Sequence, residues 1–395
     1  MRVALFSGNY NYVREGANQA LNRLVRYLEE QRGDRVRVYS PVTSTPAFEP
    51  AGTLVPVPSV PLPVRSEFRL ALTLPARLRR DLEGFAPDVV HVATPDILGV
   101  RAQRFARRRG VPVVASLHTR FETYPEHYGL GWTRPLVEAH LRRFYRRSDH
   151  VLVPTEALTA EMRQVREDDR LSVWSRGVDR QLFDPARRDE AWRLAQGFRP
   201  DDVVLLFFGR LVLEKGVDDF VEIVRALRQQ GERVRPLVVG AGPAAARFAS
   251  LQDAVLTGHL QDEELARAVA SADILLNPSR TEAFGNVVLE AMASGLAIVS
   301  ADAPNARELL KDGKNGLLCP ALDRGSYAQA VTSLAKSPAK RRSLGAAARA
   351  ASERYCWDAA SESAARAYDQ LLAGRDRKLT RSGRGWSRTR SLPGR

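Results

Sequence analysis

Short apolar, strand-like runs alternate with amphipathic helical stretches along this chain, and they do so in two successive series. The first series opens with a strand at residues 3–7, a helix over residues 16–31 and a strand at residues 36–40. Its remaining expected elements are strands at 88–92, 112–116, 150–153 and 171–174, and helices near 68–83, 98–109, 134–147 and 155–166. Alternation of this kind predicts a mostly parallel sheet with helices on both faces.

The strand pattern stops between residues 176 and 200, and a second α/β series follows it. Its expected elements are strands at 203–208, 236–239, 254–257, 274–276 and 297–300, and helices at 217–230, 262–270 and 285–294. A chain of 395 residues exceeds the roughly 250–300 residues at which one core stops growing. The sequence therefore predicts two Rossmann-like, doubly wound parallel-sheet domains that face a cleft.

The expected domain limits follow from these breaks in the pattern. The first domain covers residues 1–185 and includes a proline-dense stretch at 43–63, which is read as a surface excursion. The second domain covers residues 186–373. Residues 374–395 are rich in Arg, Ser and Gly, which predicts a basic, disordered tail.

The chain carries a formal net charge of +14, and only six of its 60 basic residues are lysine. Arginines cluster at residues 77–80, 101–109 and 142–147 and in the tail, which favours an anionic partner such as a lipid surface, nucleic acid or a phosphorylated ligand. An arginine-rich coding composition explains the same surplus. With only Cys319 and Cys356, no disulfide framework or cysteine metal site is expected, and a reducing cytoplasm is the expected compartment. No signal peptide or run of ~20 apolar residues is found.

The segment 281–295 is the most informative for chemistry. Gly285 stands at the start of an expected helix, whose free N–H groups suit a diphosphate. Glu282 precedes this helix and Glu290 lies about one and a half turns into it, so the two carboxylates flank the phosphate position. The alternative is that both are solvated surface charges. Glu290 is embedded among apolar residues, however, so its charge requires a partner.

Three further segments are candidates for the same site. Arg210 and Lys215 lie on the loop after the first strand of the second domain and can neutralise a diphosphate, although an exposed basic loop has the same composition. His118 follows a strand whose end opens onto the cleft; a structural histidine is the alternative. Gly240 begins a Gly-Ala-Gly motif that fits a loose dinucleotide fingerprint, but its place at the third element of a domain argues against a redox cofactor.

The stretch from Glu282 to Glu290, with Ala-Met-Ala-Ser-Gly after it, resembles the signature of family 4 glycosyltransferases of the GT-B fold. The resemblance implies that Glu282 contacts hydroxyls of the transferred sugar and that Glu290 holds the ribose hydroxyls of the nucleotide. It also implies that the backbone at Phe284, Gly285 and Asn286 faces the sugar and phosphates.

The same resemblance assigns the other candidates. It implies that Arg210 and Lys215 bind the donor diphosphate, that His118 orients the reacting sugar and stabilises charge, and that Gly240 lies near the nucleotide base. Gly16 corresponds to a glycine that lets the backbone approach the donor. Many relatives carry a glycine pair there, whereas this chain departs from that pattern with Glu15 before Gly16.

The implied activity is a retaining transfer of a hexosyl group from GDP-mannose or a UDP-sugar. Residues 118–124 resemble lipid-modifying, mannosyltransferase-like members, and Trp132 with the aromatic residues of 121–128 suits lipid headgroups, so a membrane lipid is the expected acceptor. The alternatives are polysaccharide or glycan assembly and, from other classes, a nucleotide-sugar epimerase or a nucleic-acid-binding module. No Asp-x-Asp pair occurs, which predicts metal-independent catalysis and no cofactor. We expect a cytoplasmic protein that attaches peripherally to the inner face of the membrane and binds no nucleic acid.

Overall fold

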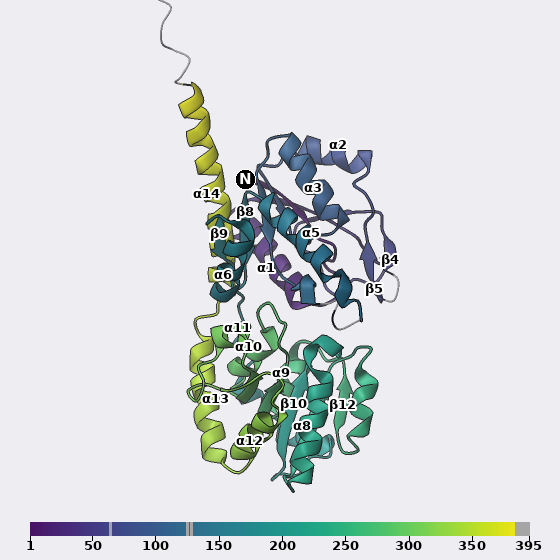
Figure 1. The fold of residues 1–395 in the computed structure, drawn as a ribbon, viewed down its shortest axis with the longest axis vertical. Helices are drawn as coiled ribbons and strands as arrows, with labels where there is room; N and C mark the ends of the chain where they lie inside the picture. The colour runs from purple at the N-terminus through teal and green to yellow at the C-terminus, as the bar shows by residue number, and fades with distance from the viewer. Residues whose placement is uncertain (63–64, 124–125, 127–128, 384–395) are drawn as a thin grey trace, which may run out of the picture.

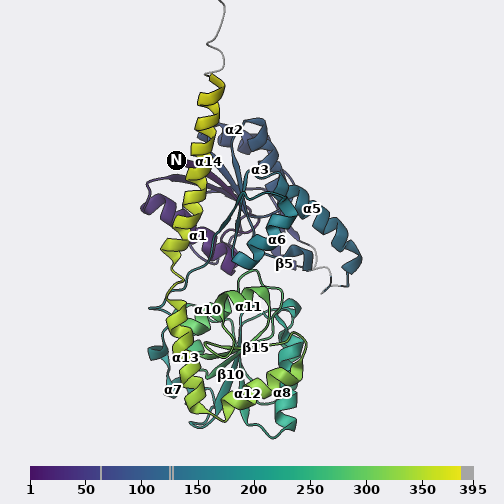
Figure 2. The same ribbon diagram turned by 60° about the vertical axis from the view of Figure 1, so that its left-hand side comes forward.

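The computed structural model describes residues 1–62, 65–123, 126 and 129–383. Two α/β domains lie one above the other, and the last long helix runs along the first of them (Figures 1 and 2). Each domain is built on one parallel sheet, which confirms the predicted fold class.

The sheet of the first domain has seven strands in the order β3-β2-β1-β6-β7-β8-β9, all parallel. The strands are β1 (Arg2–Phe6), β2 (Arg35–Ser40), β3 (Thr53–Pro56), β6 (Val89–Val92), β7 (Val113–Ser116), β8 (His150–Val153) and β9 (Leu171–Val173). Chain order reverses between β1 and β6, and at such a switch point the carboxyl ends of the strands open onto a ligand crevice.

Helices cover both faces of this sheet because successive strand residues point to opposite sides. On β1, Ala4 and Phe6 pack into one buried cluster, whereas Val3 and Leu5 pack into another. The helices are α1 (Gly16–Glu30), α2 (Ala76–Phe85), α3 (Ile97–Arg108), α5 (Arg134–Arg146) and α6 (Glu156–Arg166).

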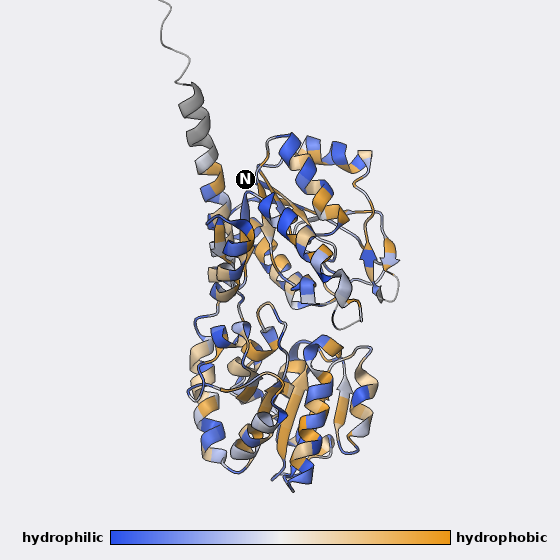
Figure 3. Cartoon of the chain, viewed as in Figure 1, coloured by the Kyte–Doolittle hydropathy of each residue, from blue (hydrophilic) through white to orange (hydrophobic). Residues whose placement is uncertain are grey.

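The second domain repeats this plan with six strands in the order β12-β11-β10-β13-β14-β15. They are β10 (Val203–Phe208), β11 (Val234–Val239), β12 (Val255–Gly258), β13 (Ile274–Asn277), β14 (Ala297–Ala301) and β15 (Leu317–Cys319). The helices are α7 (Glu190–Ala195), α8 (Val217–Gln229), α9 (Asp262–Ala270), α10 (Asn286–Ala293), α11 (Pro304–Leu309), α12 (Arg324–Ala335) and α13 (Pro338–Ser352). Alternate residues of β10 again pack into two separate cores. The strands of this sheet form an apolar interior between helices with polar outer faces (Figure 3).

The chain returns to the first domain at its end. Helix α14 (Trp357–Gly383) packs on α1 and β9, with Ala360, Ala364 and Tyr368 one turn apart in the first domain's core. Small side chains at this spacing allow close approach of the helix. Val178, in contrast, already belongs to the core of the second domain. The first domain's core therefore includes residues of α14, and the second domain's core includes a residue before 186. Packing contacts thus cross the expected domain limits in both directions.

Two local predictions are wrong, the disordered tail from residue 374 and the helix start at residue 68. Residues 374–383 continue α14 as a helix instead of forming a disordered tail; residues 384–395 lie outside the described part. In the proline-dense region, β3 joins the edge of the main sheet, and β4 (Val60–Leu62) pairs with β5 (Arg65–Leu70) in an antiparallel ribbon. The expected helix at 68–83 thus begins only at Ala76. Proline is tolerated here because edge strands leave N–H groups unpaired.

Candidate active site

A cavity of about 340 Å³ lies between the two domains, where the strands of both sheets end. All residues predicted from the sequence for catalysis or donor binding line it. They are Gly16, His118, Arg210, Lys215, Gly240, Glu282, Phe284, Gly285, Asn286 and Glu290.

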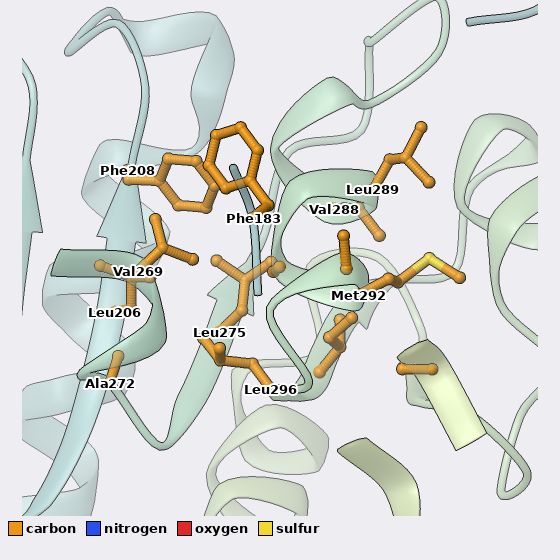
Figure 4. Packing of buried hydrophobic residues seen from close by; sticks show 14 of the residues in the cluster. Phe183, Leu206, Phe208, Val269, Ala272, Leu275, Val288, Leu289, Met292 and Leu296 are labelled. Carbon is orange, nitrogen blue, oxygen red and sulfur yellow. The ribbon is translucent and has the colours of Figure 1, made fainter. Parts of the chain in front are cut away.

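Helix α10 begins at the wall of this cavity. Gly285, just before it, has a φ of 103°, a left-handed conformation that costs glycine little. Val288, Leu289 and Met292 point from α10 into the core beneath, which also contains Phe208 (Figure 4). Since the core fixes the helix, its first turn offers unpaired backbone N–H groups at a fixed place on the cavity wall.

Glu282 is buried at the cavity and pairs with Lys215. Its Oε1 lies 3.0 Å from Lys215 Nζ, and its side chain is 8% exposed. Despite this ion pair, Oε1 accepts no hydrogen bond from any group in the described part of the chain. The loops that carry the two residues are tied together, because Ser279 Oγ and Thr281 Oγ1 both donate to the carbonyl of Glu214. The carboxylate is therefore held in place with free capacity to accept from a ligand hydroxyl.

Glu290 lies deeper on α10, and its carboxyl group is poorly solvated. Burial, with a smaller contribution from the charge of Glu282, raises the pKa of Glu290 to about 8. The group is therefore mostly protonated at neutral pH in the free protein. Polar donors of a ligand would favour its charged form.

Glu290→Gln is expected to stabilise the free protein increasingly as pH rises from 5 to 8. The folded carboxyl has a pKa of about 8 against an ordinary value of 4.5, so the folded state keeps a proton that the unfolded chain releases. Wild-type stability then falls across this window by at most about 1.4 kcal/mol per pH unit. Glutamine does not titrate and escapes this loss.

Urea unfolding of both proteins at pH 5, 6.5 and 8 measures the difference. The matched control is Glu264→Gln on the exposed start of α9, which should give no pH-dependent difference. A stability difference between Glu290→Gln and wild type that is the same at all three pH values would contradict the buried position of this carboxyl.

Arg210 joins the two domains across the cavity. Its guanidinium forms an ion pair with Glu15 of the first domain and lies 5.3 Å above the ring centre of Phe68. Burial lowers the pKa of Arg210, and the charge of Glu214 opposes that shift. In the free protein, the cation predicted to bind phosphate is thus already paired with a carboxylate.

The amino end of α1 meets the amino end of α10 at the same place. A β-carbon at Gly16 would lie 1.9 Å from Asn286 Nδ2, so only glycine fits without a shift. Arg14 adds a second bridge, with Nη1 2.9 Å from Asp262 Oδ1 on α9. These contacts bring residues of the first domain against the predicted phosphate position.

Gly240 lies on the opposite wall of the cavity, where two backbone loops pack closely. Its φ is 146°, and a β-carbon there would lie 1.9 Å from the carbonyl oxygen of Gly209. The loop after β11 therefore packs directly on the loop that carries Arg210, which explains why a glycine stands here without any dinucleotide motif.

His118 has both ring nitrogens engaged within the protein. Arg176 Nη2 donates to Nδ1 at 2.9 Å, and Nε2 lies 2.8 Å from Ser116 Oγ. Because arginine can only donate, Nδ1 must be the acceptor and Nε2 carries the proton. Burial, and then the charge of Arg176, hold the pKa of His118 well below its ordinary value. The predicted sugar-orienting histidine is thus a neutral side chain of fixed orientation.

Arg176 and Glu15 line the cavity but are absent from the sequence-based prediction. Arg176 falls where the strand pattern ends, and an arginine three residues after a strand, at the carboxyl edge of a sheet, is the signal that could have identified it. Glu15 stands out only as a departure from the family's glycine pair. Of the aromatic residues expected beside His118, Tyr124 and Tyr128 lie outside the described part.

The comparison with known proteins identifies the family. Residues 14–182 match the family described as Glycosyltransferase Family 4, and residues 202–337 match Glycosyl transferases group 1. A sulfoquinovosyl transferase of Arabidopsis thaliana is 30% identical over 372 residues, which cover 91% of this chain and 72% of that protein. The chain belongs to glycosyltransferase family 4. Its two-domain architecture is accordingly the GT-B fold, and the protein is a glycosyltransferase.

Other relatives of this family 4 glycosyltransferase carry different sugars in their names. A GDP-mannose-dependent alpha-mannosyltransferase of Mycobacterium tuberculosis is 36% identical over 315 residues, covering 77% of this chain and 80% of that protein. An alpha-monoglucosyldiacylglycerol synthase of Acholeplasma laidlawii is 26% identical over 337 residues, covering 80% and 84%. Both alignments extend over most of this chain.

Solved structures agree with the GT-B fold. Sucrose-phosphate synthase of Thermosynechococcus elongatus superimposes with a TM-score of 0.76 at 19% identity, over 94% of this chain and 99% of that one. HepE of Anabaena in complex with UDP gives a TM-score of 0.72 at 19% identity, over 94% of this chain and all of that one. At this identity the likeness concerns the fold.

Proposed function

We propose that this glycosyltransferase transfers a hexosyl group from GDP-mannose or a UDP-sugar to a lipid acceptor at a membrane surface, with retention of anomeric configuration and without a metal ion. The observation that carries the proposal is the juxtaposition, in one interdomain cavity, of the α10 amino end, two cations and two carboxylates. A nucleoside diphosphate-sugar has the complementary groups: two phosphates, a ribose and a sugar.

The donor binds with its diphosphate at the first turn of α10, between Arg210 and Lys215. Glu290 accepts from the ribose hydroxyls and Glu282 from hydroxyls of the transferred sugar. Both cations are paired with carboxylates in the free protein, Arg210 with Glu15 and Lys215 with Glu282, so the diphosphate competes with these groups for the same N–H donors.

The chemistry then follows from charge. As the bond between sugar and phosphate breaks, the sugar becomes oxocarbenium-like and negative charge develops on the departing diphosphate. Arg210, Lys215 and the α10 amino end stabilise that charge where it forms. The acceptor hydroxyl attacks on the same face, and the leaving phosphate takes its proton.

The surface of the first domain supports a lipid acceptor. A hollow between α2 and α3 is lined by arginines, and Glu83 there pairs with Arg109. The lining arginines are Arg79, Arg80, Arg101, Arg104, Arg108 and Arg109. Each basic side chain near an anionic bilayer contributes roughly 1 kcal/mol.

Apolar side chains are exposed at a second place on the first domain, around the start of α5. Leu130, Trp132 and Leu136 are exposed, Trp132 to 74%, and tryptophan favours the boundary between lipid and water. Among the described residues, no helix is both long and apolar enough to cross a bilayer. We therefore propose attachment to the surface of an anionic membrane, on its cytoplasmic side.

Transfer assays with labelled donors and liposomes test this function. We expect label from GDP-mannose or a UDP-sugar to enter the chloroform-soluble lipid fraction, faster with anionic than with zwitterionic liposomes, and the difference should vanish at high salt. Label that enters only water-soluble glycans would favour polysaccharide assembly. Donor consumption without any acceptor would contradict transfer.

A further inference from the structure

The cavity contains one buried cation that has no acidic partner among the residues described by the structure. The other four cationic residues of its lining each pair with a carboxylate in the structure: Arg14 with Asp262, Arg120 with Glu122 and Glu161, Arg210 with Glu15, and Lys215 with Glu282. Arg176, which is 3% exposed, forms no ion pair with any residue in the described part of the chain.

The hydrogen bonds of Arg176 are all to uncharged groups. Nη1 donates to the carbonyls of Trp174 at 2.8 Å and Ser175 at 3.1 Å, and Nη2 donates to His118. These bonds use three of the five N–H groups of a guanidinium. Burial lowers the pKa of Arg176 to about 10, so it stays charged at neutral pH.

The series of hydrogen-bonded side chains behind Arg176 supplies no negative charge either. His118 donates to Ser116, whose hydroxyl lies 2.7 Å from His91 Nε2, and His91 Nδ1 lies 2.6 Å from the hydroxyl of Tyr368 on α14. Donation runs in one direction along this chain, from the arginine to the tyrosine. Burial lowers the pKa of His91 to about 3 and raises the pKa of Tyr368, so both are neutral.

A buried charge without a counter-charge is costly, and a ligand that supplies the missing anion gains that energy on binding. The donor diphosphate already has Arg210, Lys215 and the α10 amino end, all in the second domain. Arg176 lies in the first domain and holds His118, beside which the proposed function places the transferred sugar and the incoming acceptor. The missing anion thus belongs to the sugar end of the reaction.

We infer that Arg176 binds an acidic substituent, a carboxylate, of one of the two sugars that meet in this cavity. The inference rests on the proposed function and narrows it, since it makes either the transferred hexose or the sugar headgroup of the acceptor an acidic one. Arginine suits this role because its planar fork matches a carboxylate and Trp174, 5.1 Å from its central carbon to the ring centre, supports its position.

Matched pairs of substrates test both sources. For the donor, UDP-glucose is compared with UDP-glucuronate, which differs only at C6. For the acceptor, glucosyl-diacylglycerol is compared with glucuronosyl-diacylglycerol at saturating donor. We expect the wild type to prefer the acidic member of one pair by about tenfold or more in kcat/KM. Arg176→Gln should abolish this preference, and Arg176→Lys, which keeps the charge, should retain part of it.

Arg120→Gln is the matched control, because that arginine lines the same cavity but is already paired; it should leave the ratio between the two substrates unchanged. A wild type that does not distinguish either pair overturns the inference, whether or not the variants fold, and so does a preference that survives in Arg176→Gln. Failure of the proposed function looks different, because then neither neutral nor acidic nucleotide sugars bind.

Discussion

Replacing Lys215 by Met is expected to lower kcat about 100- to 1,000-fold while the donor KM changes only a few-fold. The ammonium group pairs with Glu282 in the free site, so its net contribution to donor binding is small. Its contribution grows when negative charge develops on the departing diphosphate, and an interaction made mainly in the transition state affects kcat. Steady-state kinetics at several donor concentrations measure both constants.

Two further variants separate the loss of charge from side effects. Lys215→Met leaves the buried carboxylate of Glu282 unpaired, so the effect of Lys215→Met is measured again in the Glu282→Gln background, where no charge is stranded; we expect kcat to fall further there than in Glu282→Gln alone. Lys340→Met, at an exposed position of α13, is the control and should match the wild type. A kcat within threefold of wild type in Lys215→Met would remove this lysine from the mechanism.

Glu282→Gln is expected to lower kcat/KM about 100-fold or more while binding of the bare nucleoside diphosphate does not weaken, because Lys215 loses the carboxylate that competes with the phosphates. Oε1 of Glu282 is buried and accepts no hydrogen bond in the described part of the chain, which leaves it free for a sugar hydroxyl. A carboxylate makes stronger hydrogen bonds to hydroxyls than an amide does, and the difference increases as the sugar becomes cationic. UDP and GDP carry no sugar at this position.

Kinetics with the complete donor and titration with the bare diphosphate are therefore compared in the same protein. Glu264→Gln, on the exposed face of α9, serves as the charge-matched control and should change neither quantity. An equal loss of affinity for diphosphate and nucleotide sugar would move Glu282 away from the sugar and toward the phosphates.

The parts of the site that could be predicted lie on single continuous segments. The Glu282–Glu290 stretch contains its own helix start, its apolar anchor and both carboxylates, so local spacing was enough to place them together. The sequence predicts five strands of the second domain for the same reason, because their buried runs differ clearly from the helices between them, but it misses the short edge strand β15.

The parts that could not be predicted depend on contacts between distant segments. Helix α14 packs on α1 through Ala360 and Ala364, and alanines carry no sign of which domain they cover. Glu15 becomes part of the site only because the domains meet at Arg210, 195 residues further along the chain. The role of Arg176 depends on its contact with His118 and on the lack of an acidic partner among the described residues, and the sequence shows neither.

The central claim is that a nucleoside diphosphate binds with its phosphates at the α10 amino end and its ribose at Glu290. Calorimetric titration with UDP and GDP tests this claim most directly. We expect the wild type to bind at least one of the two, Glu290→Ala to lose about tenfold or more in affinity for it because the ribose hydroxyls lose their acceptor, and Glu264→Gln to bind like the wild type. Equal affinity in wild type and Glu290→Ala, or no binding of either nucleotide by the wild type, would contradict the account.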